Sequence, residues 1–320
     1  MSINKILRKI YFTGSFTLLS GCETVVMSPS GDIAAQQANL LVWATGLMLI
    51  IVVPVIFFIL LFAWRYRAGN EEAVYEPDWD HSTSLELLIW AAPLAIVIAL
   101  GALTWVSTHK LDPYRPLDRI AENRPIPEGV ETMIVEVVAM DWKWLFFYPE
   151  YGIAVVNQLA APVDRPIKFK ITSTTMMNSF FIPALAGQIY AMGGMETKLH
   201  AVINEPGIYD GFSANYSGKG FNGMRFKFIG MPEDNFEEWL TKVKADGKTL
   251  SRSVYKELAK PSEYNPVQYY NAVEPELYES ILNRCVEPGT PCMKDWMSPH
   301  EGNHNLPASA SIKSEDSHDH

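Results

Sequence analysis

Few side chains in this 320-residue chain could bind a redox metal. Thiolates and imidazoles are the ligands that copper prefers in proteins. The three cysteines are Cys22, Cys285 and Cys292, and residues 130–231 contain no cysteine and one histidine, His200. Residues 130–231 therefore lack the donors for a copper pair, and we predict that this chain holds no metal.

Cys285 and Cys292 enclose six residues that include two prolines and a glycine. Such a segment can bring two cysteines within bonding distance, and an oxidising compartment would favour a disulfide. The sequence leaves open whether these thiols are bonded or free. The histidines of the polar tail, 298–320, could bind stray metal, but a flexible solvated tail is the simpler interpretation.

Composition indicates a chain that lies partly in a membrane and partly in water. Hydrophobic residues make up 48% and charged residues 19% of the sequence. The formal net charge is −10, from 26 Lys+Arg against 36 Asp+Glu, and no basic stripe is present. Because nucleic-acid phosphates require a basic face, nucleic-acid binding is not expected.

Two uncharged apolar segments, 40–64 and 87–106, are each long enough to cross about 30 Å of hydrocarbon as a helix. Buried helices of a soluble protein are the alternative, which such long uncharged runs disfavour. Arg65 and Arg67 follow the first segment directly, whereas residues 23–39 contain no lysine or arginine. The connecting loop is therefore expected in the cytoplasm, with both flanks in the periplasm.

The N-terminus has the pattern of a bacterial secretion signal. Three basic residues precede an apolar run over 10–19, which ends in Leu-Ser-Gly-Cys at Cys22. These four residues resemble a lipobox, in which the cysteine carries the lipid. An ordinary secretion signal with a chance cysteine is the alternative. We expect residues 1–21 to be a lipoprotein signal peptide and Cys22 to be lipidated.

Between about residues 130 and 231, short apolar or alternating runs are separated by turn-forming residues. Runs at this spacing predict strands of a small antiparallel sandwich or barrel. Short helical patterns follow after residue 232. The expected strands are 132–139, 142–148, 167–172, 198–203 and 224–229, and the expected helices are 235–245, 251–259 and 275–284.

Three motifs, 141–150, 177–183 and 213–224, together resemble subunit II of haem-copper respiratory oxidases. The resemblance extends from the lipobox to about Tyr270. It implies a membrane-anchored, mainly β fold: a two-helix transmembrane hairpin, a periplasmic cupredoxin-like Greek-key β-sandwich and short C-terminal helices. The expected segments are a signal peptide (1–21), a periplasmic segment (22–39), the hairpin (40–110), the cupredoxin-like domain (111–232), a helical region (233–297) and a disordered tail (298–320).

Family members that accept electrons from cytochrome c bind two coppers through Cys-x3-Cys-x3-His-x2-Met, an upstream histidine and a backbone carbonyl. Of these ligand side chains, this chain retains only the methionine, Met224. Serine hydroxyls near neutral pH are poor copper ligands, and a phenylalanine ring has no donor atom. The altered positions are Ser213, Ser217 and Phe221 in the motif, Asn178 for the upstream histidine and Asn215 for the carbonyl residue. We expect Phe221 and Met224 to fill the former metal volume.

The altered motif is similar to subunit II of the bo-type ubiquinol oxidases. This resemblance implies a non-catalytic subunit of an enzyme that oxidises ubiquinol, reduces oxygen to water and translocates protons. The implied partners are catalytic subunit I, with its haems and copper, smaller membrane subunits and the bilayer of the bacterial inner membrane; no cytochrome c is expected. A cytochrome c oxidase subunit with unusual metal ligation and a lipid-anchored binding or assembly factor are the alternatives.

Glu86 has two candidate roles. Thr83 and Glu86 have the spacing of a capping box, with Thr83 as the helix cap. The oxidase resemblance instead implies a proton-uptake group at the cytoplasmic mouth of a channel in the catalytic subunit. For Trp142 and Trp144, expected on one face of a strand, packing is favoured over the electron-accepting role of the related aromatic run in copper-containing relatives.

Overall fold

The structure, a computed structural model, describes residues 24–70, 72–74, 76 and 78–297. The expected signal peptide, the lipidation site Cys22 and the histidines of the tail lie outside the described residues. A short 3-10 helix, η1 (Val25–Met27), opens the described chain.

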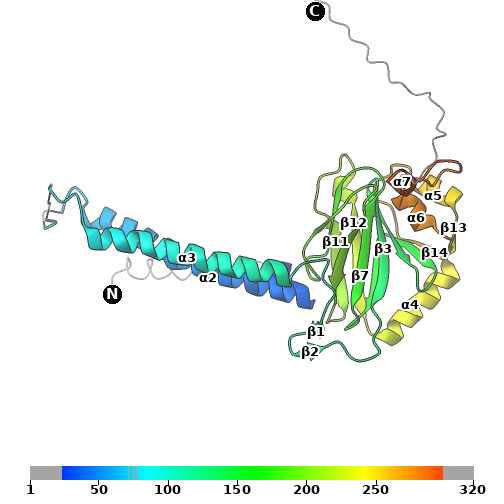
Figure 1. Cartoon of the computed structure of the whole chain (residues 1–320), viewed down its shortest axis with the longest axis horizontal. Coiled ribbons are helices and arrows are strands. Elements are labelled where there is room, and N and C mark those ends of the chain that lie inside the picture. The colour runs from blue at the N-terminus through cyan, green and yellow to red at the C-terminus, as the bar shows by residue number, and fades with distance from the viewer. Residues whose placement is uncertain (1–23, 71, 75, 77, 298–320) are drawn as a thin grey trace, which may run out of the picture.

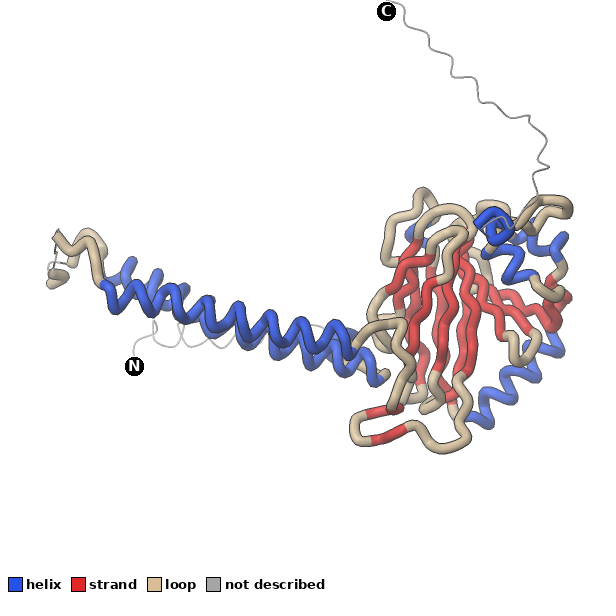
Figure 2. Tube along the Cα trace, in the orientation of Figure 1, coloured by secondary structure: helices blue, strands red, loops and turns tan. Residues whose placement is uncertain are grey.

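Two long helices extend side by side from one side of a β-sandwich (Figures 1 and 2). They are α2 (Asp32–Arg65) and α3 (Thr83–Lys110), with Pro54 and Pro93 inside them. Both have the length and composition of membrane spans, and the most apolar stretch of each is exposed in the described chain. Such exposure of apolar helices is stable only within lipid or against another protein.

The sandwich consists of a seven-stranded and a five-stranded sheet, and a two-stranded ribbon of β1 (Arg119–Ala121) and β2 (Arg124–Pro125) lies beside them. The order in the larger sheet is β10 (Thr197–Ala201), β7 (Ile167–Ser173), β3 (Met133–Met140), β4 (Lys143–Tyr148), β5 (Ile153–Val156), β14 (Gln268–Val273) and β13 (Lys248–Leu250). The order in the smaller sheet is β6 (Gln158–Pro162), β12 (Arg225–Met231), β11 (Gly207–Ser213), β8 (Asn178–Phe181) and β9 (Ile189–Ala191).

Strand alternation builds the main core between the two sheets. On β3, Val135 and Val137 face this core, and Phe169 on β7 and Phe228 on β12 join them. A second apolar cluster lies on the outer face of β3, β4 and β5, under the C-terminal helices. That second cluster explains why β4 is buried over its whole length instead of alternating.

The C-terminal region contributes strands as well as helices. Helices occur near all three expected positions, but β14 pairs antiparallel with β5 and β13 pairs with β14, so this region extends the larger sheet. The sequence pattern predicted only helices there. The helices are α4 (Glu233–Asp246), α5 (Arg252–Leu258), α6 (Leu277–Leu282) and α7 (Met293–Met297), on the part of the sandwich remote from α2 and α3 (Figure 1).

The first turns of α2 are part of the sandwich, which is why this helix begins before its apolar segment. Asp32 and Ala34 are buried, and Gly31 bridges to Ile203. A Cβ at Gly31 would lie 2.6 Å from the carbonyl oxygen of Val202, so only glycine permits this approach. The carboxylate of Asp32 accepts two hydrogen bonds from the guanidinium of Arg119, at 3.1 and 3.0 Å.

Candidate functional site

The six positions of the altered copper motif gather at one end of the five-stranded sheet. Strand β11 pairs with both β8 and β12, so Asn178 at the start of β8 lies near Ser213 at the end of β11. The backbone N–H of Ser213 donates to the carbonyl of Met224 at 3.3 Å. The chain between Ser213 and Met224, which we call the 213–224 loop, contains the 3-10 helix η2 (Phe221–Gly223).

Neutral hydrogen bonds connect the polar residues of this site. Oγ of Ser213 lies 3.2 Å from Oδ1 of Asn178 and 3.2 Å from the carbonyl oxygen of Asn215. The amide groups of Asn178 and Asn215 donate to the carbonyls of Met176 and Met177, both at 3.1 Å. A neutral hydrogen bond of this kind stabilises a fold by about 0.5–1.5 kcal/mol, so this network holds the loop with no metal–ligand bond.

Met224 and Phe221 contribute apolar contacts to different degrees. Met224 is 1% exposed and belongs to the main core, close in sequence to Phe226, whose ring stacks on Phe180 at 5.5 Å. Phe221 is only half-buried, and its ring meets the edge of exposed Tyr216 at 5.5 Å. Met224 therefore extends the core, whereas Phe221 packs at the loop surface.

Trp142 lies against the 213–224 loop from the turn between β3 and β4. The expectation that Trp142 shares a strand face with Trp144 is wrong, because Trp142 occupies this turn with φ of 65°. Its Nε1 donates to the carbonyl of Ser217 at 3.0 Å. A Cβ at Gly220 would collide with the indole ring, so the glycine allows the ring to cover the loop backbone.

Two buried polar atoms near this end of the sandwich have no hydrogen-bond partner among the described residues. They are Oγ of Ser217 and Nε1 of Trp144. Trp144 itself is fully buried and meets Phe180 and Phe226 edge-on at 5.5 and 5.7 Å, as the packing interpretation predicted. An unpartnered Oγ at Ser217 is a weak donor that lacks the charge of a thiolate.

The side chains at the site do not suit a copper pair. The only sulfur among the six positions is that of Met224, and none of the six is a histidine or cysteine. In the described part of the chain, no group of three or more His, Cys, Asp or Glu residues is arranged to hold a metal ion. The side chains of this site can therefore pack and form hydrogen bonds.

Lys143, next to Trp142, has a role that the sequence analysis missed. Its side chain is fully buried, and Nζ donates to the carbonyls of Leu258 and Lys260 at 2.8 and 2.7 Å and to Oγ of Ser262 at 2.7 Å. Burial lowers the pKa of this ammonium group, although the charge of Asp141 opposes the shift. The only sequence signal for this role was the position of a lysine inside an aromatic motif. The hydrogen-bond acceptors of Lys143 lie more than 100 residues further along the chain.

Glu86 lies in the first turn of α3, but the expected capping box does not form. The residue before the helix is Ser82, and its side chain makes no capping hydrogen bond. Oε1 of Glu86 lies 2.7 Å from Nδ1 of His81, and Nε2 of His81 lies 3.1 Å from Oγ1 of Thr83. The exposed carboxylate is thus held by a histidine that the sequence analysis did not single out.

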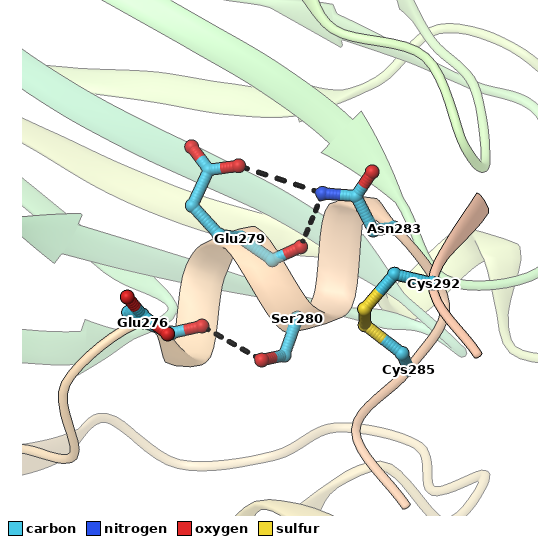
Figure 3. The surroundings of a disulfide bond; sticks show 6 residues. All are labelled: Glu276, Glu279, Ser280, Asn283, Cys285 and Cys292. Atoms are coloured by element: carbon cyan, nitrogen blue, oxygen red, sulfur yellow. Dashed lines mark hydrogen bonds between the residues drawn. A yellow bond between two sulfur atoms is a disulfide. The ribbon is translucent and has the colours of Figure 1, made fainter. Parts of the chain in front are cut away.

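Cys285 and Cys292 form a disulfide after α6, with their Cα atoms 4.9 Å apart (Figure 3). The bond closes the chain around the turn that leads into α7. Met293, which follows Cys292, packs against Gly194, and Arg284 packs against Gly193. The disulfide therefore fixes the C-terminal segment over the turn before β10.

Two apolar helices followed by this two-sheet sandwich define a membrane-anchored, cupredoxin-like protein. Residues 149–227 match the family model described as the periplasmic domain of cytochrome c oxidase subunit II, and residues 244–289 match the COX aromatic-rich motif. The periplasmic domain of cytochrome oxidase subunit II from Bradyrhizobium japonicum is 18% identical with a TM-score of 0.35, over 38% of this chain and 97% of that chain.

Longer sequence matches identify the family. Cytochrome bo(3) ubiquinol oxidase subunit 2 of Pseudomonas putida is 51% identical over 267 residues, 83% of this chain and 82% of that protein. Ubiquinol oxidase subunit 2 of Acetobacter aceti is 47% identical, over 87% and 89%. Quinol oxidase subunit 2 of Bacillus subtilis is 35% identical, over 79% and 77%. This chain belongs to the subunit 2 family of the haem-copper ubiquinol oxidases, which confirms the expected family and fold.

Proposed function

We propose that this chain is the metal-free, non-catalytic subunit II of a proton-translocating oxidase that transfers electrons from ubiquinol to oxygen. The side chains at three ligand positions carry this proposal: Ser213 and Ser217 replace thiolates and Asn178 replaces an imidazole. Ser213 and Asn178 share a neutral hydrogen bond, and Oγ of Ser217 has no hydrogen-bond partner among the described residues. Without a copper pair, the sandwich cannot relay electrons from cytochrome c. Electrons then enter the complex from a quinol, and the haems and copper belong to the partner catalytic subunit.

Support of the catalytic subunit is the main role that we assign to this chain. The apolar stretches of α2 and α3 are exposed in the described chain, so they are available to pack against helices of a partner. The first turns of α2 are fixed in the sandwich through Gly31 and the ion pair of Asp32 with Arg119. Helices held in this way would position the sandwich over the periplasmic face of the catalytic subunit.

Glu86 is our candidate proton-uptake group at the cytoplasmic side. Its carboxylate is exposed at the start of α3, away from the sandwich, and lies against His81. A carboxylate and an imidazole at a membrane surface can collect protons from water and pass them inward. In this proposal the glutamate serves proton delivery rather than closure of a capping box.

The proposed location is the bacterial inner membrane, with the sandwich in the periplasm and the loop between α2 and α3 in the cytoplasm. Arg65 and Arg67 beside the loop support this orientation. We also propose that Cys22 is lipidated after removal of residues 1–21, which would add a third anchor on the periplasmic side. Mass analysis of the mature N-terminus tests this: a diacylglyceryl mass on Cys22 supports it, and an unmodified cysteine contradicts it.

Purification of the complex from native membranes tests the proposed function. We expect the chain to co-purify with a haem-containing polypeptide and the preparation to consume oxygen with quinol but not with reduced cytochrome c. Metal analysis of this chain, separated from its partners, should give no stoichiometric copper. Two coppers in this subunit, with near-infrared absorption, would contradict the metal-free assignment. Isolation without a haem protein would instead favour an assembly factor.

A further inference from the structure

A cavity of about 330 Å³ lies where α2, α3 and the sandwich meet. Its lining includes Asp32 and Gln36 from α2, Lys110 at the end of α3, Arg115 from the following segment and His200 from β10. The N–H of His200 donates to the carbonyl of Pro113 at 3.1 Å, which places β10 directly beside the chain leaving α3. The cavity is thus at the junction between the membrane anchor and the domain.

Helix geometry puts this cavity at the depth of lipid headgroups. The apolar segment of α3 ends at Val106, and Lys110 follows four residues later, which is roughly 6 Å along a helix axis. Asp32 precedes the apolar segment of α2 by eight residues, or roughly 12 Å. A headgroup layer occupies roughly 5–7 Å beyond the hydrocarbon on each side of a bilayer. The lower rim of the cavity therefore lies within this layer and its upper rim just above it.

The arginines of the cavity are already neutralised by ion pairs. Arg119 is paired with Asp32 at 3.0 Å and Arg115 with Asp118 at 3.0 Å. Lys110, by contrast, has no ion-pair partner among the described residues. Asp112, also in the lining, has no ion-pair partner among the described residues either, and its Oδ1 accepts from the backbone N–H of Tyr114 at 2.9 Å. The lining therefore offers one unpaired ammonium group and one unpaired carboxylate at its membrane side, and any excess of positive charge must come from neighbouring residues.

Two more lysines extend this positive charge beside the cavity. Lys198 and His200 lie on the outward face of β10, and Lys168 lies opposite His200 on β7. Burial first, and then the charges of Lys168 and Lys198, lower the pKa of His200. Lys168 and Lys198 likewise form no ion pair within the described part of the chain. We call Lys110, Lys168 and Lys198 the lysine cluster.

We propose that this cavity and the lysine cluster bind the phosphate headgroup of an anionic phospholipid from the leaflet that borders the domain. Lys110 in the lining and Lys168 and Lys198 beside His200 supply charge for a phosphodiester, and polar groups of the lining such as Gln36 can bond a glycerol headgroup. Acyl chains would continue downward along the apolar surfaces of α2 and α3. The proposal depends on the membrane anchor and is independent of the electron donor of the complex.

Lipid retention by the assembled oxidase tests this site. The complex carrying wild-type chain, or the triple variant Lys110→Gln, Lys168→Gln and Lys198→Gln, is placed in nanodiscs of phosphatidylcholine with phosphatidylglycerol. The complex is then extracted in mild detergent, and native mass spectrometry counts bound lipids. A matched variant with Lys242→Gln, Lys244→Gln and Lys248→Gln removes the same charge from α4 and β13, remote from the helices (Figure 1).

We expect wild type and the matched variant to retain phosphatidylglycerol and the cluster variant to lose it by at least about tenfold, because the variant removes three positive charges that attract an anionic lipid. Inorganic phosphate at millimolar concentration should not displace the lipid. Equal retention by the cluster variant, equal loss in both variants, or full displacement by inorganic phosphate would overturn the proposal. So would photo-crosslinking from position 198 to a protein subunit with no lipid bound.

Lys198→Gln alone covers the case in which the triple variant fails to assemble. This change alters one partly exposed side chain whose neighbours in the core are Thr197 and Leu199, so the strand is retained. A drop in retained phosphatidylglycerol of severalfold supports the proposal, and unchanged retention contradicts it. Oxygen uptake with quinol is measured in parallel, so that loss of lipid is separated from loss of the oxidase.

Discussion

The indole nitrogen of Trp142 donates a hydrogen bond to the carbonyl oxygen of Ser217 at 3.0 Å. This bond joins the turn between β3 and β4 to the 213–224 loop, and the ring covers the loop at Gly220. A tryptophan with φ of 65° costs roughly 1 kcal/mol or more of backbone strain, which surrounding contacts must offset. We conclude that Trp142 helps to hold the 213–224 loop against the sandwich.

Trp142→Ala should destabilise the sandwich by about 1–3 kcal/mol, because it removes a half-buried ring and its hydrogen bond. Hydrogen exchange in the assembled oxidase should show faster exchange over residues 213–224, and thermal unfolding should give the loss of stability. The control is Trp79→Ala, an exposed tryptophan between α2 and α3.

Gly220→Ala should lower the stability of the wild-type sandwich but change little in a chain that already carries Trp142→Ala. An equal loss of stability in both backgrounds would contradict packing of the ring on this glycine.

Lys143→Met should release the C-terminal segment from the sandwich. The substitution retains the buried stem but leaves the carbonyls of Leu258 and Lys260 without their donor, at a cost of about 1–3 kcal/mol. Limited proteolysis should cleave between α5 and β14 more rapidly than in wild type. Lys242→Met, on the exposed face of α4, is the matched control. Identical cleavage rates in the two variants would show that Lys143 does not fasten this segment.

Asp32→Asn should loosen the joint between α2 and the sandwich. The Asp32 side chain is only 4% exposed. The substitution removes its charge and leaves the guanidinium of Arg119 without a counter-ion, which should lower the free energy of unfolding by about 1–3 kcal/mol. Backbone amides of residues 30–38 should then exchange faster. Asp118→Asn breaks an exposed ion pair with Arg115 and should cost less than about 1 kcal/mol. A larger effect from Asp118→Asn would refute this ranking.

Glu86→Gln should slow proton uptake by the assembled oxidase severalfold without changing its assembly. The amide retains hydrogen-bonding capacity next to His81 but cannot carry a proton at neutral pH. Time-resolved proton uptake and the amount of purified complex are the two measurements. Glu72→Gln, which removes an acid from the loop between α2 and α3, is the control. Normal uptake in Glu86→Gln would remove the proposed role, and lost assembly would point to a structural one.

Glu136 should make the stability of the sandwich depend on pH. Burial raises the pKa of this carboxyl above 4.5, although Lys170 at 3.4 Å opposes the shift. The native state therefore binds the proton more readily than the unfolded state, so stability falls as pH rises from about 4.5 through the raised pKa. Glu136→Gln should flatten that part of the profile in thermal unfolding. Glu131→Gln, an exposed acid before β3, should leave the profile as in wild type.

The sequence by itself was sufficient to predict the two apolar helices and the main strands, and to show that residues 130–231 lack cysteine and hold one histidine. Apolar length and alternation are properties of neighbouring residues, so 40–64, 87–106 and the strand at 132–139 could be located along the chain. The hydroxyl side chains at Ser213 and Ser217 are likewise given by residue type alone. No partner elsewhere in the fold can turn a hydroxyl into a thiolate.

Tertiary structure alone decided the contacts that hold these elements together. Lys143 meets acceptors 115 and 117 residues away, and Asp32 meets Arg119 87 residues away. The C-terminal strand β14 pairs with the edge of β5 that β4 leaves open. The short residue pattern of β14 alone does not reveal this partner. Pairing across such separations depends on the whole chain path, so residue type and local periodicity could not predict these contacts.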